Sequence, residues 1–75
     1  MVFRIQPIRA GSHVRVRFWS APVASGTFAG LGELVMLPAE WDIWRAFYRA
    51  VATARFDEHA DGTIEIEMPA TMVNA

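Results

Sequence analysis

The chain of 75 residues contains no cysteine, and this absence limits how so short a sequence can form a stable fold. One hydrophobic core in a chain of this size supplies only about 3–5 kcal/mol of net stability. Small domains usually add disulfides, a bound metal or association with another surface. Disulfides are excluded here, and the two histidines alone cannot complete a four-ligand zinc site. Efficient packing or oligomerisation is left to stabilise the chain.

The composition is rich enough in apolar residues for good packing. Hydrophobic residues make up 53% of the sequence and include three Trp and five Phe, which is too apolar for a disordered chain. We expect a single domain over residues 1–75. Apolar runs fall far short of the ~20 residues that span a bilayer, and residues 1–9 lack the apolar segment of a signal peptide. We therefore expect a soluble cytoplasmic protein without a membrane partner.

The formal net charge of −1 hides an uneven distribution along the chain. Residues 1–32 hold four arginines and no acid, which gives +4, whereas residues 33–75 carry −5. All seven basic residues are arginine. Arginine, unlike lysine, makes bidentate contacts with carboxylates and phosphates, so these side chains can bind either kind of group.

Four segments have the pattern of β-strands. Residues 13–19 alternate most clearly, and the two faces are Val14, Val16 and Phe18 on one side and His13, Arg15, Arg17 and Trp19 on the other. Residues 2–9 predict a strand that joins them in an antiparallel hairpin. Residues 31–37 predict a third strand, and residues 63–68, after the Asp61-Gly62 turn, a fourth.

Residues 38–55 predict one amphipathic helix. Pro38 suits the first helical position, and Glu40 suits the positive end of the helix dipole. The predicted inner face consists of Trp44, Phe47, Tyr48, Val51 and Ala54, with Trp41 and Ile43 at its edges. We expect Trp44 and Phe47 in the core and Trp41 and Tyr48 partly exposed. The helix should fade near residues 55–59, and residues 70–75 should be frayed.

Together these elements predict a small α+β fold. A single-layer antiparallel sheet, with strand, strand, strand, helix, strand in sequence order, carries the helix on one face. The order of strands within the sheet stays open. If the second and fourth strands are neighbours, Arg15 and Arg17 can pair with Glu65 and Glu67 and cancel the charge asymmetry. If they are apart, the molecule has separate basic and acidic patches.

The sequence offers weak support for chemistry. The acidic group Asp57, Glu58, His59 and Asp61 matches no metal-binding spacing and reads as a polar helix exit and turn. The glycines at 26, 30 and 32 precede a strand rather than a helix, so a bulge or a close backbone approach explains them better than a phosphate site. No spacing joins His13 and His59 to a nucleophile. We expect no enzyme, no cofactor and no metal.

Basic residues interleaved with an aromatic side chain on a strand can bind single-stranded nucleic acid. The candidate residues for this function are Arg4, Arg9, Arg15, Arg17 and Trp19. A nucleic-acid-binding protein usually has a clear basic excess, which this chain lacks. Nucleic-acid binding is therefore the alternative interpretation.

The favoured interpretation is a small non-catalytic protein-binding module, because Trp, Tyr and Arg contribute most of the binding energy at protein interfaces. The candidate partner-binding residues are Arg15, Arg17, Trp19, Trp41, Arg45, Tyr48 and Arg49. The module would self-associate, as a homodimer for example, or dock on a larger partner. Its size also suits a compact inhibitor or accessory protein of a virus or mobile element. The sequence specifies neither the partner nor the oligomeric state nor the biological process.

Overall fold

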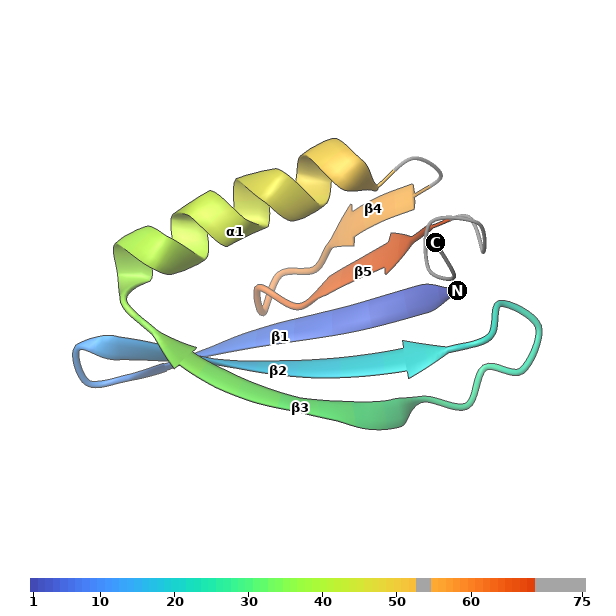
Figure 1. Cartoon of the computed structure of the whole chain (residues 1–75), viewed down its shortest axis with the longest axis horizontal. Coiled ribbons are helices and arrows are strands. Elements are labelled where there is room, and N and C mark those ends of the chain that lie inside the picture. Colours follow the sequence, from blue (N-terminus) through green and yellow to red (C-terminus); the bar gives the residue numbers. More distant parts are fainter. Residues whose placement is uncertain (53–54, 69–75) are drawn as a thin grey trace.

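Two long strands, Val2–Ala10 (β1) and His13–Ala21 (β2), form an antiparallel hairpin at the centre of the fold. The computed structural model describes residues 1–52 and 55–68. Ala29–Met36 (β3) pairs with β2, and Pro38–Val51 (α1) follows it. Arg55–Glu58 (β4) and Ile64–Glu67 (β5) form a second hairpin. The five strands lie in the order β3-β2-β1-β5-β4, all antiparallel (Figure 1). The predicted α+β class is confirmed.

The sheet has one strand more than the sequence predicts. Residues 55–58, where we expected the helix to fade, form β4, and α1 ends at Val51. The backbone N–H of Ala52 closes the last helical turn on the Tyr48 carbonyl at 3.0 Å. Phe56 is the only apolar residue of β4, so its sequence carries no strand alternation. Pairing with β5 makes this segment a strand.

Alternation along the strands separates an inner face from an outer face, as predicted. Val14 and Val16 of β2 and Ile64 and Ile66 of β5 are buried, together with Ile5 of β1. These side chains form the core with Met36 and Trp41. The outer face carries the charged residues of these strands, except Arg9 of β1, which lies opposite the buried Val14. The predictions for residues 70–75 and for Ala54 lie outside the described residues.

The helix presents a different face to the sheet from the one that periodicity indicated. Trp41, expected to be partly exposed, is buried in the core, and Tyr48 and Ala52 pack on the same side. Trp44 and Phe47, expected in the core, are exposed. α1 is therefore rotated so that one edge of its apolar stripe, rather than the middle, contacts the sheet.

Two observed features explain this rotation. α1 runs along the β4 side of the molecule, with β3 on the opposite side (Figure 1). Arg45 bonds Glu58 of β4, and the guanidinium of Arg49 lies 5.2 Å from the ring centre of Phe56. These contacts hold α1 toward β4, so the other side of its apolar stripe faces the space beside β3.

Among the described residues, no helix is long and apolar enough to cross a membrane.

Candidate functional site

An apolar groove separates the last two turns of α1 from β3. It has a volume of about 480 Å³, and its floor is formed by core residues of the central strands, including Ile5 and Ile66. Phe18 and Met68 also line it. Among the described residues of its lining, Glu33 alone is charged. Contact between water and so apolar a surface is unfavourable, so the groove favours an apolar occupant.

The helical wall of the groove is aromatic. Phe47 and Tyr48 line it, with ring centres 6.0 Å apart, and Phe18 meets Tyr48 edge-on at 6.4 Å. The ring centre of Trp44 lies 5.6 Å from that of Phe47, in an edge-to-face arrangement, and 6.0 Å from that of Tyr48. Aromatic pairs at these separations attract by about 0.5–1.5 kcal/mol each. Burial in this cluster raises the pKa of the Tyr48 phenol. The wall is thus held in place before any ligand arrives.

The opposite wall is β3, an edge strand of the sheet. Its residues from Ala29 to Val35 are all exposed, and Leu31 and Leu34 each leave 58% of their surface in solvent. The pairing with β2 shifts register between Phe18 and Trp19, opposite Gly32, whose φ of +138° favours glycine. This is a bulge, one of the two explanations that the glycine pattern left open. Both Leu31 and Leu34 line the groove.

Arg15 and Arg17, which the sequence nominated, lie on the outer face of the sheet, away from the groove. The Nε atoms of Arg15 and Arg17 lie 3.1 and 2.8 Å from the carboxylate of Glu33 on β3. β1 separates β2 from β5, so the condition under which Arg15 and Arg17 would pair with Glu65 and Glu67 is not met. Glu33 of β3, the other neighbour of β2, partly neutralises the basic charge of β2.

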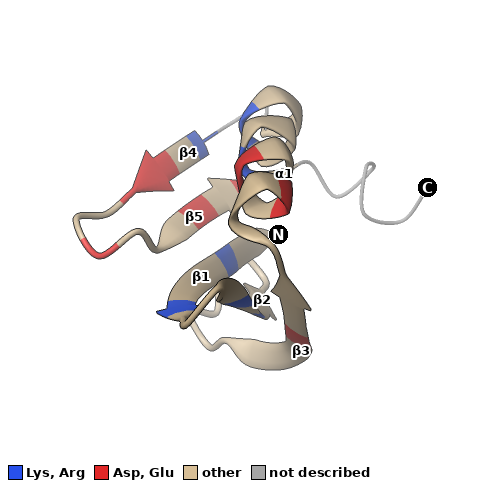
Figure 2. Ribbon diagram, turned by 90° about the vertical axis from the view of Figure 1, so that its left-hand side faces the viewer, with Lys and Arg blue, Asp and Glu red and all other residues tan. Residues whose placement is uncertain are grey.

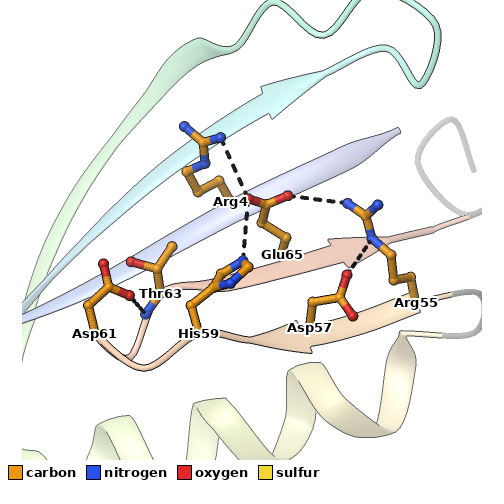
Figure 3. A network of polar contacts seen from close by, with 7 residues as sticks. All are labelled: Arg4, Arg55, Asp57, His59, Asp61, Thr63 and Glu65. Carbon is orange, nitrogen blue, oxygen red and sulfur yellow. Dashed lines mark hydrogen bonds and ion pairs between the residues drawn. The ribbon is translucent and has the colours of Figure 1, made fainter.

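Glu65 forms the centre of a second polar network on the outer face (Figure 3). Its carboxylate accepts a hydrogen bond from Arg55 at 3.3 Å and lies 3.6 Å from Arg4 and 3.5 Å from His59. Trp19 lines a polar hollow beside this network, with Arg4 and His59. Arg4 also lies over the ring of Phe28 at 4.0 Å. Arg4 thus already has two intramolecular partners.

The helical residues that the sequence nominated are mostly engaged within the fold. Trp41 belongs to the core, and Arg45 donates two hydrogen bonds to Glu58, at 2.5 and 2.6 Å. This contact lowers the pKa of Glu58 and raises that of Arg45. Arg49 lies over Phe56. Of the four helical residues in the list of candidates, Tyr48 alone lines the groove.

The remaining polar candidates are dispersed. Arg9 is exposed near the end of β1, and His13 Nδ1 lies 3.0 Å from the hydroxyl of Ser12. The carboxylate of Asp61 accepts a hydrogen bond from the Thr63 backbone N–H, which lowers the pKa of Asp61 and closes the turn. In the described part of the chain, no three His, Asp or Glu side chains are placed to hold a metal ion.

The sequence-based residue list missed the groove itself. The sequence predicts Leu31 and Leu34 only as members of the third strand, and it predicts Phe47 as a core residue. The available signal was the surplus of aromatic residues, more than one helix on a small sheet can cover. No protein family model, no curated protein and no solved structure matches the chain. Its function is therefore inferred from these contacts alone.

Proposed function

We propose that this protein is a small non-catalytic protein-binding module that holds an apolar segment of another polypeptide between α1 and β3. The observation that carries this proposal is the apolar groove, which lies directly beside an edge of β3 that pairs with no other strand among residues 1–52 and 55–68. Exposed apolar patches of this kind mark interaction surfaces in small proteins. Tyr48, which lines the groove, and the neighbouring Trp44 are of the types that contribute most of the binding energy at protein interfaces.

The strand edge favours a polypeptide over a small apolar molecule. An extended segment placed along β3 would satisfy the backbone N–H and C=O groups of its free edge, as in other cases of strand addition. Every second side chain of that segment would point into the groove. A small apolar molecule would fill the volume and leave the edge unpaired.

Nucleic-acid binding through Arg4, Arg9, Arg15, Arg17 and Trp19 remains the alternative, and the ion pairs count against it. Arg4, Arg15 and Arg17 each have a carboxylate within 3.6 Å. Binding a phosphate would require breaking these pairs or sharing the guanidinium. Binding of labelled single strands at low salt, where phosphate contacts are strongest, tests this alternative.

The proposed function is tested by selecting peptides from a displayed random library on the immobilised full chain. We expect selected peptides with alternating apolar residues and amide NMR shifts concentrated in β3 and in the last two turns of α1. Leu34→Glu and Phe47→Glu should abolish binding, because each places a charge in the groove. Val23→Glu is the matched control, since Val23 is exposed to the same extent as Leu34 and lies outside the groove.

Two results would contradict the proposal. One is the absence of any selected peptide from a library that yields binders to a control domain. The other is binding that survives Leu34→Glu and shifts the amides of Arg15, Arg17 and Trp19 instead. Circular dichroism spectra of the variants must match that of the wild-type chain for either result to count.

A further inference from the structure

We propose that the polypeptide bound at this site is a second copy of the same chain, joined by antiparallel pairing of the two β3 strands. This inference rests on the proposed function and names its partner. The five-stranded sheet would continue across the interface into a ten-stranded one. A two-fold arrangement of this kind uses the same surface on both copies, so β3 would supply both the site and the segment that occupies it.

The composition of β3 suits the apolar groove that β3 itself lines. It is eight residues long and contains no proline, and its inward-facing side chains are apolar. Glu33 is its only charged residue, and the two arginines of β2 already neutralise this carboxylate. Long apolar edge strands pair readily with further strands, and natural proteins usually block them with charges, proline or bulges. The bulge of β3 lies at Leu31, and residues 32–36 beyond it pair with β2 in regular register.

The symmetry of the contact favours one register. A two-fold axis perpendicular to the sheet keeps both helices on one face and sets one residue of β3 opposite its own copy. An axis at Glu33 would oppose two carboxylates, which destabilises a strand pair. An axis at Leu34 sets Leu34 against Leu34, Glu33 against Val35, and Gly32 against Met36 of the second copy. This register brings Leu34 and Val35, which are 58% and 61% exposed in the single chain, into the interface.

The available area and the small core support the same partner. A stable interface buries about 800 Å² per partner, roughly a sixth of the 4830 Å² surface of this chain. The side chains buried almost completely are few and of moderate size: Ile5, Val14, Val16, Ile64 and Ile66. Chains of this length without disulfides commonly depend on association for stability. A second copy is always present at the concentration of the first.

Sedimentation equilibrium of the full chain across micromolar concentrations tests the inference. We expect a mass of twice 8.4 kDa for the wild-type chain. Leu34→Glu sets two carboxylates opposite each other at the axis and should weaken the dimer at least about tenfold. Val23→Glu changes an equally exposed valine outside β3 and should leave the dimer unchanged. A wild-type chain that is monomeric throughout, or equal weakening by both variants, overturns the inference.

A cysteine cross-link tests the register and does not depend on the fold tolerating a buried charge. The chain has no cysteine, so any disulfide of Leu34→Cys must join two copies. Residues directly opposite in antiparallel strands have Cα atoms about 4.5–5.5 Å apart, within the range that a disulfide spans. Leu34→Cys should form a covalent dimer under mild oxidation much faster than Val23→Cys. Equal rates for the two variants contradict pairing at Leu34.

The outcomes separate this inference from the proposed function. A monomer that still binds selected apolar peptides at β3 rejects the second copy as partner and supports the binding module. A monomer that binds no peptide rejects both. A dimer that is insensitive to Leu34→Glu and whose Leu34→Cys variant fails to cross-link places the interface elsewhere and overturns the inference.

Discussion

The two edges of the sheet, β3 and β4, differ in nearly every property that controls strand pairing. β4 is four residues long and three of them are charged, whereas β3 is eight residues long with one charge. Figure 2 shows this contrast, with charged segments over much of β4 and a single acidic segment on β3. One edge of this fold is protected against further pairing, and the other is left open.

The protection of β4 comes from contacts as well as from its composition. Arg55 contacts Asp57 at 3.1 Å and Glu65 at 3.3 Å, and Glu58 is held by Arg45 of α1. The guanidinium of Arg49 covers Phe56. α1 therefore covers this side of the sheet and leaves the β3 side uncovered. A single helix cannot cover both edges, and the side it leaves open is where we propose that a partner binds.

The largest expected effect concerns the side of the sheet that α1 covers. Trp41→Ala removes a side chain that is 5% exposed and should cost about 3–5 kcal/mol, enough to unfold most of the protein. Trp44→Ala removes the same side chain three residues later, where it is 46% exposed, and should cost about 1 kcal/mol. Urea unfolding followed by circular dichroism measures both. Equal losses would mean that Trp44 is also part of the folded core.

The second prediction compares glycines at the two ends of the sheet. Gly62 closes the β4–β5 hairpin with φ of +87°, so Gly62→Ala should cost about 1–2 kcal/mol. Gly30 in β3 has no such constraint, and an added Cβ would meet Trp19 at an ordinary 4.0 Å. Gly30→Ala should change the free energy of unfolding by less than about 0.5 kcal/mol. A larger loss at Gly30 than at Gly62 would show that the open edge is the more tightly specified one.

Much of this fold could be predicted from the sequence, because local chemistry determines it. The alternation of Val14 and Val16 with Arg15 and Arg17 set the faces of β2, and Pro38 set the start of α1. β4 could not be predicted, since its single apolar residue gives no pattern and its pairing with β5 depends on the whole hairpin. Short charged edge strands will generally be missed for this reason.

The site was harder to predict because it depends on where elements lie relative to one another. Periodicity correctly identified an apolar stripe on α1. Which residues of that stripe contact the sheet depends on the lateral position of the helix. The contact of Arg45 with Glu58 on β4 fixes that position. Strand order likewise decided whether Arg15 and Arg17 meet Glu33 or Glu65. Neither the lateral position of the helix nor the strand order can be read from a single sequence.

The third prediction tests the ion pair that ties α1 to the protected edge. Glu58→Gln should lower the free energy of unfolding at neutral pH by about 0.2–1 kcal/mol, because both partners are partly exposed. Arg45 lowers the pKa of Glu58 in the folded state below its unfolded value, so this contribution is present above the unfolded pKa. It is lost as the pH falls through the folded pKa. Urea unfolding of both proteins across acidic pH should show their difference closing, and a constant difference would contradict the ion pair.

The smallest expected effect lies at the open edge. Glu33→Gln removes the carboxylate that Arg15 and Arg17 share, and all three side chains are partly exposed. Its cost in unfolding free energy should therefore stay below about 0.5 kcal/mol and shrink with added salt. Glu58→Gln, at the protected edge, is the comparison, measured by urea unfolding at two salt concentrations. If Glu33→Gln proves the more costly, the charge on β3 stabilises the fold as much as the charges on β4 do. The two edges would then differ in length and cover, and no longer in the use they make of charge.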